Sequence, residues 1–163
     1  MLLPALVGAA GALTAGVTAV VYATFSARVM PALARLPDAV GIERMQAFNR
    51  TAVQPPFMVC FFGAAAAGAY LLVRLLRSER TPADLLLAAG GALYLGGFAL
   101  TVVVNVPLND RLASVATRSP EAVALWQAYL GEWTRANTVR GVLSALATAA
   151  LLAGTVGVLR HDP

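Results

Sequence analysis

Long uncharged runs dominate the pattern of hydrophobic and polar positions. Four stretches contain no charged residue, and they cover residues 1–27, 51–73, 85–109 and 141–159. Each is close to or longer than the roughly 20 residues that a helix needs to cross the core of a bilayer. The runs are apolar all round, whereas helices of a soluble bundle would keep polar outer faces. The pattern predicts an all-α, integral membrane four-helix bundle.

The predicted spans are about 2–27, 53–76, 84–105 and 141–159, within a single membrane domain that covers residues 1–163. Amphipathic helical connectors are expected between spans one and two and between spans three and four. The first run has no basic residue ahead of it and no evident cleavage site, so we expect it to stay as helix one rather than to be a removed signal peptide.

Composition agrees with a membrane protein. Of the 163 residues, 59% are hydrophobic and only 12% are charged, about half the charged fraction of a typical soluble domain. The mean hydropathy is +0.73. These values disfavour the alternative of a soluble bundle with deeply buried helices.

The residues that most often bind metals are scarce. Cys60 is the only cysteine, which excludes a disulfide within the chain and a thiolate cluster. His161 is the only histidine and is the third residue from the end, so histidine-based zinc, copper or haem chemistry is disfavoured. We therefore predict no metal site and no bound cofactor.

All twelve cations are arginines, but they form no dense cluster of the kind that nucleic acid requires. Membrane topology, lipid phosphates or an anionic ligand explain them better. Arg74, Arg77 and Arg80 in the short second connection, with Arg160 near the end, favour an orientation with both termini in the cytoplasm. The arginine-only composition is typical of a GC-rich bacterial source, so the bacterial inner membrane is the expected location.

Small residues four positions apart are expected to let the spans approach closely. One such pair occurs in each of the first three spans: Ala12 and Gly16, Ala64 and Gly68, and Ala92 and Gly96. These pairs predict bundle packing and say nothing about activity, and a homo-oligomer is left open.

A stripe of aromatic and polar residues precedes the fourth span. Trp126, Tyr129, Trp133, Asn137 and Arg140 recur at steps of three or four, which places them on one face of a helix. An interfacial aromatic belt is the simpler interpretation. A belt, however, does not require asparagine and arginine to continue the same face toward the membrane, where both are costly without partners. The stripe therefore favours a pocket.

The first and third connections carry further polar groups. Gln46, Asn49 and Arg50 share a face by spacing, and NVPLND places Asn105 and Asn109 one turn apart around a break at Pro107. Each asparagine alone is better explained as a cap on free backbone groups. Because both connections emerge on the same side of a four-span bundle, we expect the groups to converge.

Four segments carry a resemblance to a known family: FSARVMPALARLP (25–37), GIERMQAFNRTAVQPPFM (41–58), NVPLNDRLA (105–113) and WQAYLGEWTRANTVR (126–140). In order and spacing they resemble the anthrone oxygenase family of small integral membrane proteins (DUF1772). The resemblance implies four membrane helices and oxygenation of the central methylene carbon of an anthrone, without flavin or haem. Many members have Trp-Asn-His-Val-Arg where this chain has Ala136-Asn137-Thr138-Val139-Arg140, which argues against a histidine-dependent mechanism.

The resemblance also suggests roles for the residues. The hypothesis is a monooxygenase whose catalytic residues are Arg140, Asn137 and Asn105, with Asp110 or Glu132 as the base. A hydrophobic, anthrone-like substrate would stack between Trp126 and Trp133 and react with O2, and the other binding residues would be Tyr129, Asn109, Asn49 and Arg50. The alternative is a non-catalytic membrane module that binds a lipid, a quinone or a partner subunit. A transporter is less favoured, because no span centre carries an ionisable group.

Overall fold

The computed structural model describes residues 2–77 and 80–160, and in these ranges the chain is helical except for short connections. His161 lies outside the described residues. The elements in order are α1 (Leu2–Thr24), η1 (Phe25–Val29), α2 (Met30–Leu33), α3 (Asp38–Ala52), α4 (Phe57–Leu75), α5 (Pro82–Leu100), η2 (Thr101–Asn105), α6 (Val106–Ala113) and α7 (Pro120–Arg160). The symbols η1 and η2 denote π-helical segments.

Four helical columns are long and apolar enough to cross a membrane, as the uncharged runs predict. They are Leu2–Leu33, Phe57–Leu75, Pro82–Ala113 and Pro120–Arg160. The protein is thus an all-α membrane bundle. The second column, with 19 residues, is about 28 Å long at 1.5 Å per residue, close to the thickness of the hydrocarbon core. The other three columns continue well beyond that length.

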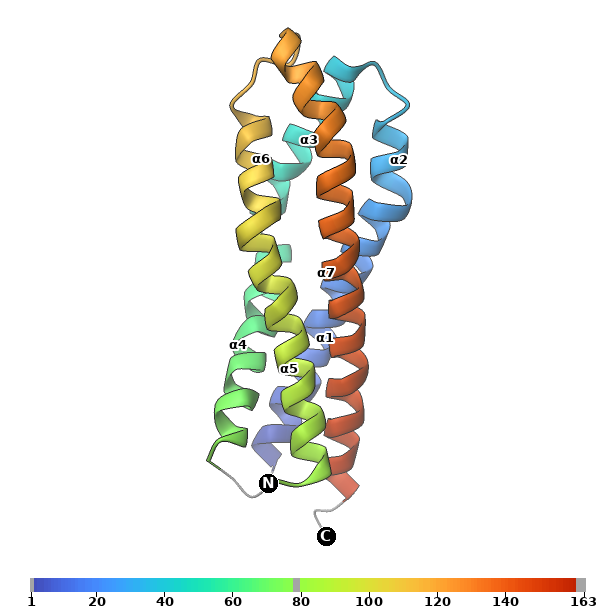
Figure 1. Cartoon of the computed structure of the whole chain (residues 1–163). Helices are drawn as coiled ribbons and strands as arrows, with labels where there is room; N and C mark the ends of the chain where they lie inside the picture. Colours follow the sequence, from blue (N-terminus) through green and yellow to red (C-terminus); the bar gives the residue numbers. More distant parts are fainter. Residues whose placement is uncertain (1, 78–79, 161–163) are drawn as a thin grey trace.

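The extra length of these columns gathers at one end of the molecule. Figure 1 shows α2, α3, α6 and the first part of α7 together at the top, and the start of α1, the end of α7 and the facing ends of α4 and α5 at the bottom. The first and third connections therefore do share one side, as expected. This end has its own apolar core, with Ile42 and Met45 of α3 and Leu112 of α6 fully buried around Trp126 of α7.

In the first and third columns a π-helical segment precedes a proline, and the column stays helical on both sides of it. The Met30 N–H donates to Phe25 O at the end of η1, and the Val106 N–H donates to Thr101 O at the end of η2. Pro31 and Pro107 follow in the first turn of α2 and α6. The predicted break at Pro107 is therefore wrong, because the wider π turn accommodates the proline while the column stays helical.

Close contact between the spans depends on glycines. A Cβ atom built on Gly91 of α5 would lie 2.7 Å from the backbone oxygen of Gly68 in α4. The pair Ala64 and Gly68 is buried as predicted, but Ala92 and Gly96 are exposed. In α5 the contact is made instead by the neighbouring face, where Gly90, Gly91 and Gly97 are buried, so the third predicted pair was assigned to the wrong side of its helix.

Candidate functional site

A buried arginine stands at the centre of the polar face predicted on α7. The side chain of Arg140 is only 7% exposed, and Nε and Nη2 both donate to Oδ1 of Asn137, at 3.2 and 2.9 Å. Nη1 donates to Oγ1 of Thr101, at 3.1 Å. The guanidinium also lies over two rings, 4.1 Å from the centroid of Tyr22 and 5.3 Å from that of Trp133. Arg140 is thus held by three elements of the bundle.

Every one of these partners is uncharged. Among residues 2–77 and 80–160, no carboxylate forms a salt bridge with Arg140. A buried charge normally needs a counter-charge, because its solvation by water has been lost. Amide and hydroxyl dipoles together with two aromatic faces compensate part of that loss here.

Asn137 fixes the arginine to α1 and η1. Its Nδ2 atom donates to the backbone oxygen of Tyr22 and to Oγ of Ser26, both at 2.7 Å. Since those donations use the amide nitrogen, Oδ1 is the atom that faces Arg140. The side chain is fully buried. Asn137 therefore orients the guanidinium as part of a chain of hydrogen bonds that crosses between α7 and the first column.

Asn105, at the end of η2, is also fully buried but only partly satisfied. Its Nδ2 atom donates to the backbone oxygen of Trp133 over 3.4 Å, and its Oδ1 atom has no hydrogen-bond partner. Buried amide oxygens are rarely left without a donor, and each such case calls for a specific explanation. This acceptor is available to a ligand or a water molecule.

A ladder of stacked rings runs along α7. Trp126 and Tyr129 stack with centroids 5.7 Å apart, and Tyr129 and Trp133 stack at 5.9 Å. All three side chains are almost completely buried. The prediction that a substrate stacks between Trp126 and Trp133 is wrong, because the ring of Tyr129 already occupies that place. Trp126 packs instead against Gly41 of α3, where an added Cβ would lie 2.9 Å from its ring.

Asn109 of α6 ties the lower part of this ladder to the third column. Its Oδ1 atom accepts from the Tyr129 hydroxyl at 2.7 Å and from Nε1 of Trp133 at 2.8 Å. On the other side, Nδ2 of Asn49 donates to the Tyr129 hydroxyl at 3.4 Å. The asparagines of both long connections therefore meet on α7, as the sequence predicts.

Gln46 of α3 donates hydrogen bonds to the backbone rather than to the polar cluster. Its Nε2 atom donates to the carbonyl oxygens of Leu112 and Val115, at 2.8 and 3.3 Å, where α6 ends. Arg50, Asp110 and Glu132 are all exposed and lie outside the buried cluster. The structure thus brings Asn49, Asn105, Asn109, Tyr129, Trp133, Asn137 and Arg140 together, and leaves these three predicted residues apart from them. Trp126 adjoins the set through its stack on Tyr129.

Sequence reasoning missed three residues of the cluster, Tyr22, Ser26 and Thr101. Each lies in an uncharged run that reads as a plain membrane span. The signal that they offered is local. Hydroxyl groups within a span need hydrogen-bond partners, and an arginine at the edge of another span needs groups that compensate its lost solvation. Only the π-helical segments, which begin at Phe25 and Thr101, reveal where these hydroxyls lie.

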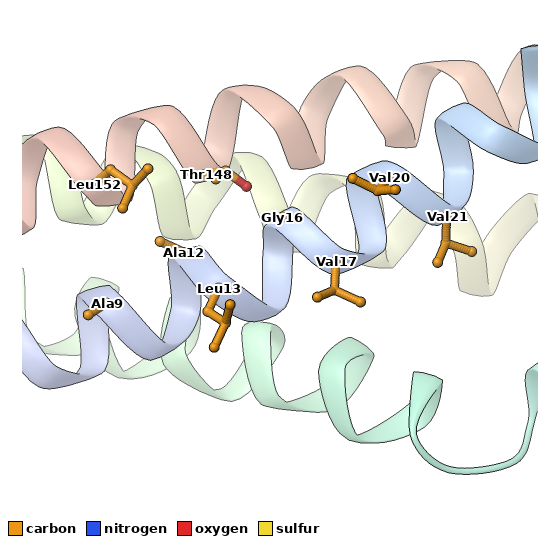
Figure 2. A pocket seen from close by; sticks show the side chains of 9 residues that line it. All are labelled: Ala9, Ala12, Leu13, Gly16, Val17, Val20, Val21, Thr148 and Leu152. Atoms are coloured by element: carbon orange, nitrogen blue, oxygen red, sulfur yellow. The ribbon is translucent and has the colours of Figure 1, made fainter.

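An open apolar groove lies elsewhere, along α1 beside α7 (Figure 2). Its walls include Ala12, Gly16, Val20 and Leu152. None of the predicted site residues lines it, and Leu13 and Val20 beside it are 70% and 67% exposed on the face that a bilayer would cover. The groove contributes no polar chemistry and is separate from the Arg140 cluster.

Chemically, the cluster presents a fixed cation with no carboxylate paired to it among the described residues. It offers a fixed cation, an unpaired amide oxygen and aromatic faces, a set suited to a flat aromatic molecule with one anionic oxygen. No group of three or more histidine, cysteine, aspartate or glutamate side chains among the described residues is arranged to hold a metal ion.

Comparison with known proteins agrees with this picture. The family model described as anthrone oxygenase matches residues 45–150, more than half of the chain. The match includes every residue of the cluster from Asn49 to Arg140, whereas Tyr22 and Ser26 precede it. No curated protein and no solved structure matched the chain. Since the family model covers most of the chain and its buried polar cluster, this protein belongs to the anthrone oxygenase family.

Proposed function

We propose that this protein is a membrane-bound oxygenase that converts the acidic methylene of an anthrone-like aromatic compound into a carbonyl group, with O2 as oxidant and no bound cofactor. The observation that carries the proposal is Arg140, a buried cation whose partners are all neutral. Loss of a proton from the methylene gives an enolate, and its oxygen is the anion that such a guanidinium stabilises.

The reaction balances without a further reductant. The methylene proton passes to a base, and the enolate gives one electron to O2, so that a carbon radical and superoxide form. These two combine through a new C–O bond, and protonation gives a hydroperoxide. Loss of water from the hydroperoxide leaves the carbonyl, so that one CH2 group and one O2 become one C=O group and one H2O. The contribution of the protein is to stabilise the enolate and to hold the substrate in place.

The proposed reaction also needs a base that takes the methylene proton, and two carboxylates lie near the cluster. Asp110 follows Asn109 directly, and Glu132 precedes Trp133, so each carboxylate is one residue from the cluster while it is exposed. An exposed carboxylate can hand the proton on to water after each turnover. Replacement of Asp110 by Asn and of Glu132 by Gln, one at a time, assigns the role to one of them.

Arg140→Met is the decisive variant. The protein in lipid nanodiscs is supplied with an anthrone, and oxygen uptake and quinone absorbance are followed together. Loss of the cation should lower the rate about 10²- to 10³-fold, the effect of removing one donor to a developing oxyanion. The free energy of unfolding should fall by about 1–3 kcal/mol, because the buried Oδ1 atom of Asn137 loses both of its donors, so the rates are compared well below the melting temperature of the variant. Arg135→Met is the matched control, because Arg135 is exposed on the same helix.

A rate for Arg140→Met equal to that of the wild type would contradict the proposal. The non-catalytic alternative gives a different result: the wild-type protein would bind the anthrone or a quinone without any oxygen uptake above the spontaneous rate. We further propose that both termini and the α4–α5 connection face the cytoplasm of a bacterial inner membrane, which places the Arg140 end outside. Cysteine labelling at Arg80 and at Arg118 from either side of the membrane tests that orientation.

A further inference from the structure

A ligand that reaches the buried cluster from outside needs a place where the surrounding helices can separate. Three of the four columns are continuous helices at the level of Arg140, and their backbones cannot separate locally without loss of hydrogen bonds. The side formed by α3 and the second column, α4, differs, because the chain is interrupted between Ala52 and Phe57, where α3 ends and α4 begins.

The interruption is loosely held. Val53, Gln54, Pro55 and Pro56 are all exposed, and the two prolines have no N–H group to donate. The helices on its two sides also pack on different neighbours: α3 lies mainly against α6 and α7, and α4 against α5 and α1. A small movement between α3 and α4 therefore disturbs neither of these packed units.

Phe48, near the end of α3, and Phe57, at the start of α4, flank the interruption, and each reaches the cluster through one ring. Phe48 of α3 packs edge-on against Phe25, with centroids 5.4 Å apart, and Phe25 lies 5.9 Å from Trp133. Phe57 of α4 packs edge-on against Tyr22 at 6.0 Å, and Tyr22 lies against Arg140. Phe48 is 41% exposed and Phe57 is half-buried. On this side the cover consists of side chains, which change rotamer far more easily than a helix parts.

The depth of the interruption fits a ligand that comes from the lipid. Because α4 alone is about as long as the hydrocarbon core is thick, its first residue, Phe57, lies near one edge of that core. A flat hydrophobic molecule with one polar oxygen collects at this depth, with its polar group toward the headgroups. Arg140 lies at the same level, since Tyr22 contacts both Arg140 and Phe57.

We propose that the interruption between α3 and α4 is a lateral gate, closed by Phe48 and Phe57, through which a planar aromatic ligand passes from the bilayer to Arg140. The identity of the ligand rests on the proposed oxygenase function. The gate itself depends only on the packing of α3 and α4, and it is tested without any substrate.

The test uses the fluorescence of Trp133. In a Trp126→Phe background Trp133 is the only tryptophan of the chain, and its quenching is measured in nanodiscs with a nitroxide-labelled alkane dissolved in the bilayer and with acrylamide in the water. Phe48→Ala and Phe57→Leu should each raise quenching by the alkane about fivefold, the factor that corresponds to the loss of one edge-to-face aromatic contact. Quenching by acrylamide should stay as in the background protein.

Phe62→Ala is the matched control, because Phe62 is an exposed phenylalanine of α4 that does not contact Tyr22 or Phe25. Unchanged quenching by the alkane in both gate variants would overturn the proposal, and so would a rise in acrylamide quenching alone, which would place the route in the aqueous face. If the gate variants behave as expected while an anthrone gives no oxygen uptake, the route stands and the oxygenase proposal fails.

Discussion

The sharpest test of how the cluster is held together is Asn109→Ala. In the wild-type protein one atom, Oδ1 of Asn109, accepts hydrogen bonds from both the Tyr129 hydroxyl and Nε1 of Trp133. Both donors belong to side chains that are almost completely buried, at 1% and 3% exposure. Alanine removes the acceptor and leaves two donors without a partner.

The expected cost follows from these two bonds. A buried donor left unsatisfied costs about 1–3 kcal/mol, so the two together would cost up to about 6 kcal/mol in a dry site. Asn109 itself is only half-buried, and a water molecule can reach part of the space that alanine leaves. We therefore expect the free energy of unfolding to fall by about 2–4 kcal/mol. Asn109→Asp keeps an oxygen acceptor in the same place and should lose much less.

The assay is equilibrium unfolding in mixed micelles, followed by the fluorescence of the tryptophans, for Asn109→Ala, Tyr129→Phe and the double variant. Because the Tyr129 hydroxyl and Asn109 share a hydrogen bond, the double variant should be less destabilised than the sum of the single variants by about 1–2 kcal/mol. Full additivity, or a loss below about 0.5 kcal/mol for Asn109→Ala, the level of an ordinary surface substitution, would refute the reasoning.

Two further predictions concern the bundle itself. Gly91→Ala should destabilise the protein by about 1–3 kcal/mol in the same assay, because the new Cβ would lie 2.7 Å from the backbone oxygen of Gly68. The control is Gly131→Ala, at a helix position where an added Cβ has nothing within 4 Å, and it should stabilise the protein by up to about 1 kcal/mol. Equal effects of the two substitutions would contradict the close contact between α4 and α5. Asp84→Ala should cost about 2 kcal/mol, because the buried carboxylate both caps α5 and pairs with Arg74; a melting temperature equal to that of the wild type would contradict this role.

Much of the polar face on α7 was accessible from the sequence, because helical spacing alone places Trp133, Asn137 and Arg140 together. The convergence of Asn49 and Asn109 on that face was also predictable, since consecutive antiparallel spans put the first and third connections on one side. The sequence did not predict that the ring of Tyr129 fills the space between the two tryptophans, although Tyr129 belongs to the same stripe. Spacing says that three rings share a face but does not say whether they leave room for a fourth.

What the sequence by itself determined is the set of membrane helices and the family, because the free energy of placing a residue in a bilayer is largely a local property that adds up along each run. Tertiary structure alone decided what surrounds Arg140. Its partners Tyr22 and Thr101 come from two other columns, and their positions depend on the π-helical turns and on how closely the glycines let the helices approach. Such contacts depend on rotation and register between helices, and neither is encoded in the spacing of any single segment.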